Sequence, residues 1–189
     1  LKGHKYLLDA FAAVAGQFPD AHLLLVGDGI LREALERQVL DRGIAGRVTF
    51  AGLVPPAQIP DYIAAMDMVA HPSLREGLPK AVAQAFAEGR PVVAFDADGA
   101  RELVRDGETG YLVSPGDART LADRLARLIS DPASAAEMGR RGQERVLALF
   151  PVENMVRRIE TLYRRLPAGS RMPAVGQKSC HRGEKHYNV

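Results

Sequence analysis

Short apolar runs alternate with longer amphipathic stretches between Ala21 and Val113. The short runs are typical of strands, and the longer stretches, with apolar positions every three or four residues, are typical of helices. This alternation predicts an α/β fold: a Rossmann-like parallel sheet with helices on both faces. Strands are predicted at 21–26, 47–52, 68–71 and 92–95 with a shorter one within 106–117, and helices at 5–18, 30–42, 56–63 and 78–87.

Three more helices are predicted towards the end of the chain, at 118–130, 133–149 and 152–166. The last has one apolar face, and its arginines make either a solvated face or a surface attracted to an anionic membrane. After Leu166 the sequence mixes Pro, Gly, Ser, Lys and His without periodicity. We therefore expect one domain at 1–166 and a disordered tail at 167–189. The arginines are Arg157, Arg158, Arg164 and Arg165.

Composition narrows the class of protein. A chain of 189 residues with 47% hydrophobic content has room for one globular core. Its formal charge of +2 gives no sign of a nucleic-acid partner. No run reaches the roughly 18 to 20 apolar residues of a membrane span, and no leader resembles a signal peptide. Cys180 is the single cysteine, which excludes an intramolecular disulfide and favours a cytoplasmic location.

Most of the functional signal lies in residues 72–94, PSLREGLPKAVAQAFAEGRPVVA. Pro79 suits the first helical position, so a helix is predicted to begin near Leu78 and to end at Gly89. Gly77 lies in the loop before it. A helix start after a glycine-containing loop presents free backbone N–H groups, which predicts a site for a phosphate or another anion.

Glu76 precedes this helix start, and Lys80, Gln84 and Glu88 recur at intervals of four along one helix face. We expect Glu76 and Gln84 to flank one pocket. A carboxylate and an amide suit the hydroxyl groups of a sugar or a ribose, with phosphates held between them at the helix start. The alternative is an ordinary α/β loop with a charged rim.

The segment SLREGLPKAVAQAFAEGRPVVAF resembles the signature of the retaining, nucleotide-sugar-dependent glycosyltransferases of family 4, group 1, which have the two-domain GT-B fold. That signature has a Glu, seven residues that include Gly and Leu-Pro, and a second Glu. The resemblance implies that the chain is the C-terminal half of a GT-B fold. It also implies that Glu76 binds the donor sugar and that Gln84 stands where the second Glu binds the ribose. The implied donor-binding residues between them are Gly77, Leu78, Pro79 and Lys80.

The N-terminal Lys2-Gly3 is similar to the same family's Lys-Gly, which follows a strand ending in Gly-Arg. In the family, that Arg and Lys hold the donor diphosphate. We expect Lys2 to take this role and the chain to be a fragment, inactive alone, that lacks the Arg, the first strand of the donor domain and the acceptor domain. The alternative for Lys2 is a frayed terminal lysine.

Two further turns follow strands. Gly27-Asp28-Gly29 begins like a dinucleotide-binding fingerprint, but Arg32 occupies the third glycine position, so the evidence for NAD is weak. The resemblance places this turn near the nucleotide and places the nucleobase near Gly52 and Leu53. Each turn also has a purely structural interpretation, as a tight connection that uses glycine for its conformational freedom.

Other polar residues are weaker candidates. His71 either completes the strand at 68–71 or acts as a catalytic base, and we favour the first. Asp96, Asp98 and Glu102 resemble a cation site, although Asp is also common in turns and caps, which we favour. The glycosyltransferases that this sequence resembles generally need no bound metal. We therefore expect no metal and no cofactor, with the nucleotide sugar as substrate.

Together these points predict a transferase that moves a sugar from a nucleotide-diphosphate sugar to an acceptor hydroxyl with retention. Glu76 and Lys2 are the predicted catalytic residues. The resemblance implies front-face attack, in cell-surface polysaccharide or glycolipid synthesis, at the cytoplasmic face of a membrane. Three alternatives remain: a non-catalytic nucleotide-binding domain, a nucleotide-sugar epimerase of GT-B architecture, and an NAD-dependent oxidoreductase, which the incomplete glycine fingerprint disfavours.

Overall fold

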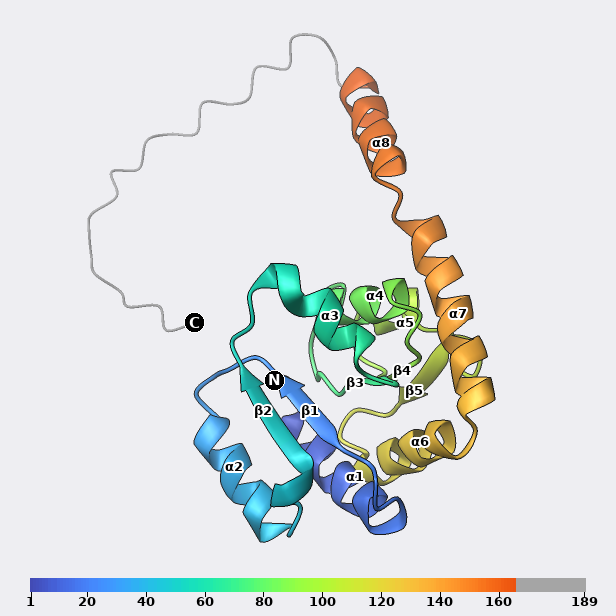
Figure 1. Cartoon of the computed structure of the whole chain (residues 1–189). Coiled ribbons are helices and arrows are strands. Elements are labelled where there is room, and N and C mark those ends of the chain that lie inside the picture. Colours follow the sequence, from blue (N-terminus) through green and yellow to red (C-terminus); the bar gives the residue numbers. More distant parts are fainter. Residues whose placement is uncertain (166–189) are drawn as a thin grey trace, which may run out of the picture. The chain divides into compact units, whose positions relative to one another are not determined.

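The computed structural model describes residues 1–165, and the chain divides into two compact units (Figure 1). The first runs from Leu1 to Phe150, and the second begins at Pro151. Of the second, the described part is the helix α8 (Val152–Arg165). The predicted tail at 167–189 lies outside the described residues, and the domain boundary at 166 stays a prediction.

The first unit alternates strands and helices in the order that the sequence predicts. Its elements are α1 (His4–Gln17), β1 (Leu23–Val26), α2 (Arg32–Asp41), the 3₁₀ turn η1 (Ala45–Arg47), β2 (Val48–Gly52), the 3₁₀ turn η2 (Pro56–Gln58), α3 (Ile59–Ala64), β3 (Val69–His71), α4 (Lys80–Ala87), β4 (Val92–Phe95), α5 (Ala100–Leu103), β5 (Gly110–Val113), α6 (Ala118–Ser130) and α7 (Pro132–Leu149).

All pairings among these five strands are parallel, which confirms the predicted fold class. Their hydrogen bonds divide them into two groups, a two-stranded sheet β1–β2 and a three-stranded sheet in the order β3–β4–β5. In the larger sheet β4 is central, with Val93 between Ala70 and Tyr111. In the smaller sheet Leu24 lies opposite Thr49.

Strand β4 is buried on both faces. Val93 and Phe95 point into a core shared with α1 and α6, whereas Val92 and Ala94 point into a second core with α4. All four residues are at most 1% exposed. Figure 1 shows α1 and α6 on one side of this sheet and α4 and α5 on the other. The continuous apolar run VVAF is therefore the expected sequence of a covered parallel strand.

The C-terminal end of α4 is closed by Gly89, as predicted. Gly89 has a φ of 67°, which only glycine adopts without strain. The N–H of Arg90 donates to the carbonyl of Ala85 at 2.9 Å, and the N–H of Gly89 donates to that of Phe86 at 2.9 Å. This pair of bonds is a Schellman motif, which satisfies carbonyls that the helix end leaves free.

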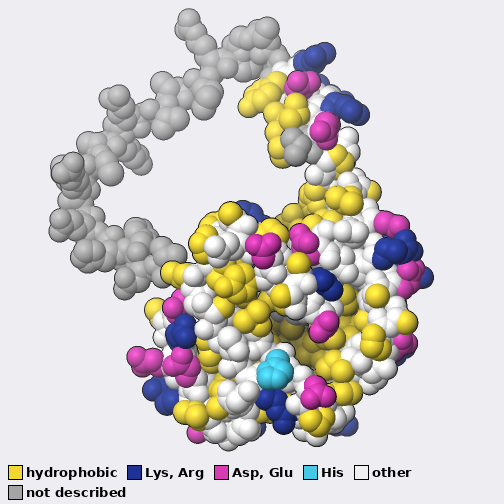
Figure 2. Space-filling model, in the orientation of Figure 1, with side chains coloured by type: hydrophobic (Ala, Val, Ile, Leu, Met, Phe, Trp, Pro, Cys, Tyr) yellow, Lys and Arg dark blue, Asp and Glu magenta, His cyan; other side chains and the backbone are white. Residues whose placement is uncertain are grey.

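Helix α8 is amphipathic. Met155, Ile159, Leu162 and Tyr163 are exposed on it, and Figure 2 shows hydrophobic side chains along one side of the helix with charged ones on the other. No helix within residues 1–165 is long and apolar enough to cross a membrane. The contact with an anionic membrane surface stays a prediction.

Candidate functional site

Lys2 and Glu76, the two predicted catalytic residues, form an ion pair although 74 positions separate them in the chain. The Lys2 side chain is 62% exposed and that of Glu76 only 22%. The hydrogen bond from Lys2 is the main reason why the pKa of Glu76 lies below its ordinary value, and burial partly opposes it. Lys2 is therefore not a frayed terminal lysine.

Two further polar side chains lie against the Glu76 carboxylate. The Oγ of Ser73 is 3.4 Å from Glu76 Oε1 and 3.2 Å from the carbonyl oxygen of Arg75, and Ser73 is only 3% exposed. The Nε2 of His71 is 3.8 Å from the same Oε1 atom. Figure 2 shows histidine, basic and acidic side chains meeting on one face of the first unit.

The segment before α1 is fixed against the loop that follows β3. The carbonyl of Leu1 accepts the N–H of Leu74 at 2.9 Å. Gly3 has a φ of 72°, and a Cβ there would lie 1.8 Å from the carbonyl oxygen of Pro72. Only glycine permits this close approach, which brings Lys2 to Glu76.

The loop that follows β4 is joined to the other side of Glu76. The N–H of Glu76 donates to Asp98 Oδ2 at 2.9 Å, and the N–H of Gly99 donates to the carbonyl of Gly77 at 3.0 Å. A Cβ on Gly99 would lie 2.0 Å from the same carbonyl oxygen. Asp98 itself has a φ of 44°. Three loops thus fix the position of the Glu76 carboxylate.

Helix α4 begins one to two residues later than predicted. Pro79 has a ψ of 99° and is therefore the cap that precedes the helix, and Lys80 is the first helical residue. The Pro79 carbonyl accepts the N–H groups of Val82 and Ala83. Among the described residues, no hydrogen bond occupies the N–H groups of Lys80 and Ala81. The helix start therefore leaves these two N–H groups free among the described residues, with Pro79 outside it, and anion binding there stays a prediction.

The other predicted residues of this helix differ in exposure. Pro79 is buried, whereas Gly77, Lys80 and Gln84 are exposed and Leu78 is 42% exposed. Gln84 therefore lies on an accessible face of the helix that follows Glu76. That Glu76 and Gln84 share one pocket stays a prediction.

Gly27, Gly52 and Leu53 lie at the ends of β1 and β2. The N–H of Gly27 donates to the carbonyl of Gly52 at 2.9 Å, and both glycines have a positive φ. Leu53 is 83% exposed. The guanidinium of Arg32 lies 5.3 Å from the centre of the Phe50 ring. The bond between Gly27 and Gly52 thus joins the ends of β1 and β2, with Leu53 exposed beside them.

Two of the acidic residues 96, 98 and 102 have partners within the described chain. Asp96 pairs with Arg101, and Asp98 accepts the backbone N–H of Glu76. Among residues 1–165, no group of three His, Cys, Asp or Glu side chains is placed to hold a metal ion. The expectation that the protein uses no metal and no cofactor stays a prediction.

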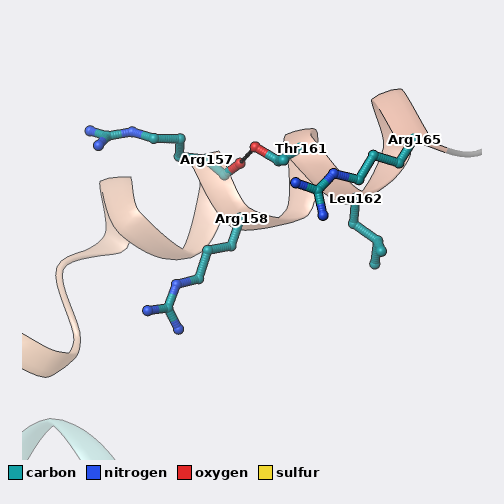
Figure 3. Close-up of a pocket in the computed structure, with 5 residues that line it drawn as sticks. All are labelled: Arg157, Arg158, Thr161, Leu162 and Arg165. Atoms are coloured by element: carbon teal, nitrogen blue, oxygen red, sulfur yellow. Dashed lines mark hydrogen bonds between the residues drawn. The ribbon is translucent and has the colours of Figure 1, made fainter.

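Figure 3 shows a shallow hollow along α8. The side chains of Arg157, Arg158 and Arg165 spread apart in this view, and Thr161 Oγ1 donates to the carbonyl of Arg157 at 2.7 Å. One helix alone lines the hollow, so we assign no ligand to it.

Sequence reasoning missed the residues that position the site. The contact of Ser73 with Glu76, the close approach of Gly3 to Pro72 and the bond between Asp98 and the Glu76 backbone were not anticipated. The sequence carries one usable signal, since the dipeptides Lys2-Gly3 and Asp98-Gly99 both place glycine beside a charged residue. The contacts themselves join residues far apart in the chain, which periodicity does not reveal.

The fold and this site define a class: a Rossmann-like α/β domain of the GT-B type, corresponding to its C-terminal half. The family model for glycosyl transferases group 1 matches residues 1–131. The chain belongs to that family.

Known relatives and solved structures agree with this family assignment. The lipopolysaccharide core biosynthesis glycosyltransferase LpsE of Rhizobium meliloti is 32% identical over 152 residues, which cover 80% of this chain and 43% of LpsE. The structure of HepE from Anabaena in complex with UDP has a TM-score of 0.81 at 33% identity, covering 87% of this chain and 46% of HepE. The C-terminal domain of LpcC from Francisella tularensis has a TM-score of 0.72 at 28% identity, covering 78% of each chain. The chain spans less than half the length of LpsE and HepE.

Proposed function

We propose that this chain binds a nucleotide-diphosphate sugar as the donor-binding part of a retaining glycosyltransferase. The observation that carries the proposal is the ion pair of Lys2 with Glu76, a residue of the loop that leads into α4, whose first N–H groups are unoccupied among the described residues. A cation and free backbone N–H groups suit a diphosphate. A fixed carboxylate suits the hydroxyl groups of a sugar.

In the proposed reaction the donor loses a nucleoside diphosphate, so negative charge develops on the leaving phosphate. Lys2 and the N–H groups of Lys80 and Ala81 would stabilise that charge. Glu76 would accept hydrogen bonds from the donor sugar, and Gln84 would bind the ribose. The leaving phosphate would help to take the proton of the acceptor hydroxyl, so attack would occur on the face that it leaves, with retention.

HepE, whose structure contains UDP, supports UDP as the first nucleotide to test. Synthesis of a cell-surface polysaccharide or glycolipid is the proposed setting, and LpsE is a relative named for such a pathway. The acceptor would bind to a further domain, of the kind that the longer relatives have room for.

Calorimetric titration of the chain with UDP, GDP, ADP and NAD, and then with the matching nucleotide sugars, tests the proposal. We expect saturable binding of one nucleoside diphosphate and a different affinity for its sugar form. Binding of NAD alone would contradict the proposal. So would the absence of all binding by a chain whose cooperative unfolding shows that it is folded.

Variants of Glu76 and Gln84 test the division of roles. Glu76→Ala is expected to weaken binding of UDP-glucose more than binding of UDP, because its carboxylate contacts only the sugar. Gln84→Ala is expected to weaken both ligands equally, since both contain the ribose. Each loss is expected to be about tenfold, as for one hydrogen bond of about 1.4 kcal/mol. Equal losses for both ligands in Glu76→Ala would contradict this division.

A further inference from the structure

His71 has a polar atom that the rest of the site does not satisfy. The side chain is 15% exposed, and its Nε2 atom is buried with no hydrogen-bond partner among residues 1–165. A buried unpaired nitrogen costs free energy, so such atoms usually have a purpose. The nearest acidic oxygen is Glu76 Oε1 at 3.8 Å, too far for a hydrogen bond.

The charged groups around His71 decide its protonation. Burial is the main reason why the pKa of His71 lies below its ordinary value, the Glu76 carboxylate opposes it, and Lys2 and His4 lower the pKa further. The pKa of His4 is itself lowered by burial, the N-terminal amine and Lys2. With Lys2 seated on Glu76, His71 is therefore neutral at neutral pH.

In the proposed function Lys2 contacts the donor diphosphate, and this contact would draw its ammonium group away from Glu76. The Lys2 side chain is 62% exposed, whereas the Glu76 side chain is 22% exposed and the Glu76 backbone N–H donates to Asp98. When Lys2 moves to a diphosphate, a partly buried carboxylate loses its cation. Ser73 can supply one hydroxyl, but no charge. Within residues 1–165, His71 is the remaining group beside this carboxylate that can become positively charged.

We propose that His71 replaces Lys2 as the partner of Glu76 when the donor binds, so that donor binding is coupled to the uptake of one proton by His71. This rests on the proposed function, because it needs Lys2 to contact the donor phosphates. The proton comes from solvent and converts the neutral imidazole to imidazolium, in which both ring nitrogens donate. His71 acts through Glu76 and is therefore a positioning residue.

The first test needs no ligand. NMR titration of the histidine ring signals is compared between the wild type and Lys2→Met, with the exposed His22 as the internal control. Removal of the Lys2 charge is expected to raise the pKa of His71. In Lys2→Met/Glu76→Gln the pKa of His71 is expected to fall again, because the attracting carboxylate is gone. An unchanged His71 titration in Lys2→Met would overturn the proposal.

The second test measures the coupling itself. UDP-glucose is the probe, because its phosphates lack the ionisation near pH 6 of a terminal phosphate. Calorimetry in two buffers of different ionisation enthalpy counts the protons taken up. We expect net uptake by the wild type and by His22→Asn, with affinity rising as pH falls towards about 6. Each unit by which donor binding raises the pKa of His71 allows the affinity for UDP-glucose to rise by up to tenfold.

The variant His71→Asn is expected to bind UDP-glucose with no proton uptake and with an affinity independent of pH. Equal proton uptake by His71→Asn and the wild type would overturn the proposal. In that case the variant His4→Asn would show whether His4 takes up the proton instead. Failure of the chain to bind any nucleotide sugar would instead overturn the proposed function, and the ligand-free titration would still decide whether His71 responds to Lys2.

Discussion

The sheets β3–β4–β5 and β1–β2 contribute different parts of the candidate site, and they differ in burial. Every residue of β4 is at most 1% exposed, with a core on each face. The residues of β1 are all only half-buried. Glu76 follows β3, which is half-buried but pairs with the buried strand β4, whereas Gly27 and Gly52 lie at the ends of β1 and β2, a sheet without a fully buried strand. A rigid support suits the part of a site where a charge must be placed accurately.

The largest expected effect compares two phenylalanines. Phe95 of β4 is 1% exposed, and Phe50 of β2 is half-buried under Arg32. Phe95→Ala is expected to lower the free energy of unfolding by about 3 to 5 kcal/mol, because it leaves a cavity in a closed core. Phe50→Ala is expected to lower the free energy of unfolding by clearly less than Phe95→Ala does. Urea denaturation measures both, and equal losses would remove the contrast between the sheets.

A smaller effect is expected at the loops. Gly99→Ala forces a Cβ against the carbonyl of Gly77, so we expect a loss of stability of about 1 to 3 kcal/mol. Because the same contact positions Glu76, binding of UDP-glucose should weaken as well. Gly29→Ala is the control, since its Cβ would meet nothing within 4 Å. Unaltered stability and binding in Gly99→Ala would show that the loops are not tightly held.

The smallest effect is expected on α2, which carries Arg32 over Phe50 of the smaller sheet. Arg32→Met removes the cation over the Phe50 ring and the hydrogen bond to Glu36 at 2.8 Å. At this partly exposed position solvent screens the charge, so the loss of stability is expected to be smaller than that of Gly99→Ala. Arg37→Met on the same helix is the exposed control. A loss as large as that of Phe95→Ala would mean that surface contacts hold the β1–β2 region.

Much of this arrangement could be predicted from local sequence. The helix at 118–130 has the predicted bounds, and Gly89 ends α4 as expected, because periodicity and glycine conformations depend on neighbouring residues. Pro79 was predicted to be the first helical residue of α4, but it is the cap residue one position earlier. A proline suits both positions. The contact of Lys2 with Glu76 and the division into two sheets depend on residues far apart, so the sequence alone did not reveal them.

The most direct test of the central claim is an amide chemical-shift titration of the ¹⁵N-labelled chain with UDP. The claim is that the diphosphate binds at the start of α4 beside Lys2. We predict that the largest shifts at saturation occur at Lys80, Ala81 and Gly77, with smaller shifts near Gly27 and Gly52. Saturable binding that leaves the amides of Lys80 and Ala81 unshifted would contradict the claim.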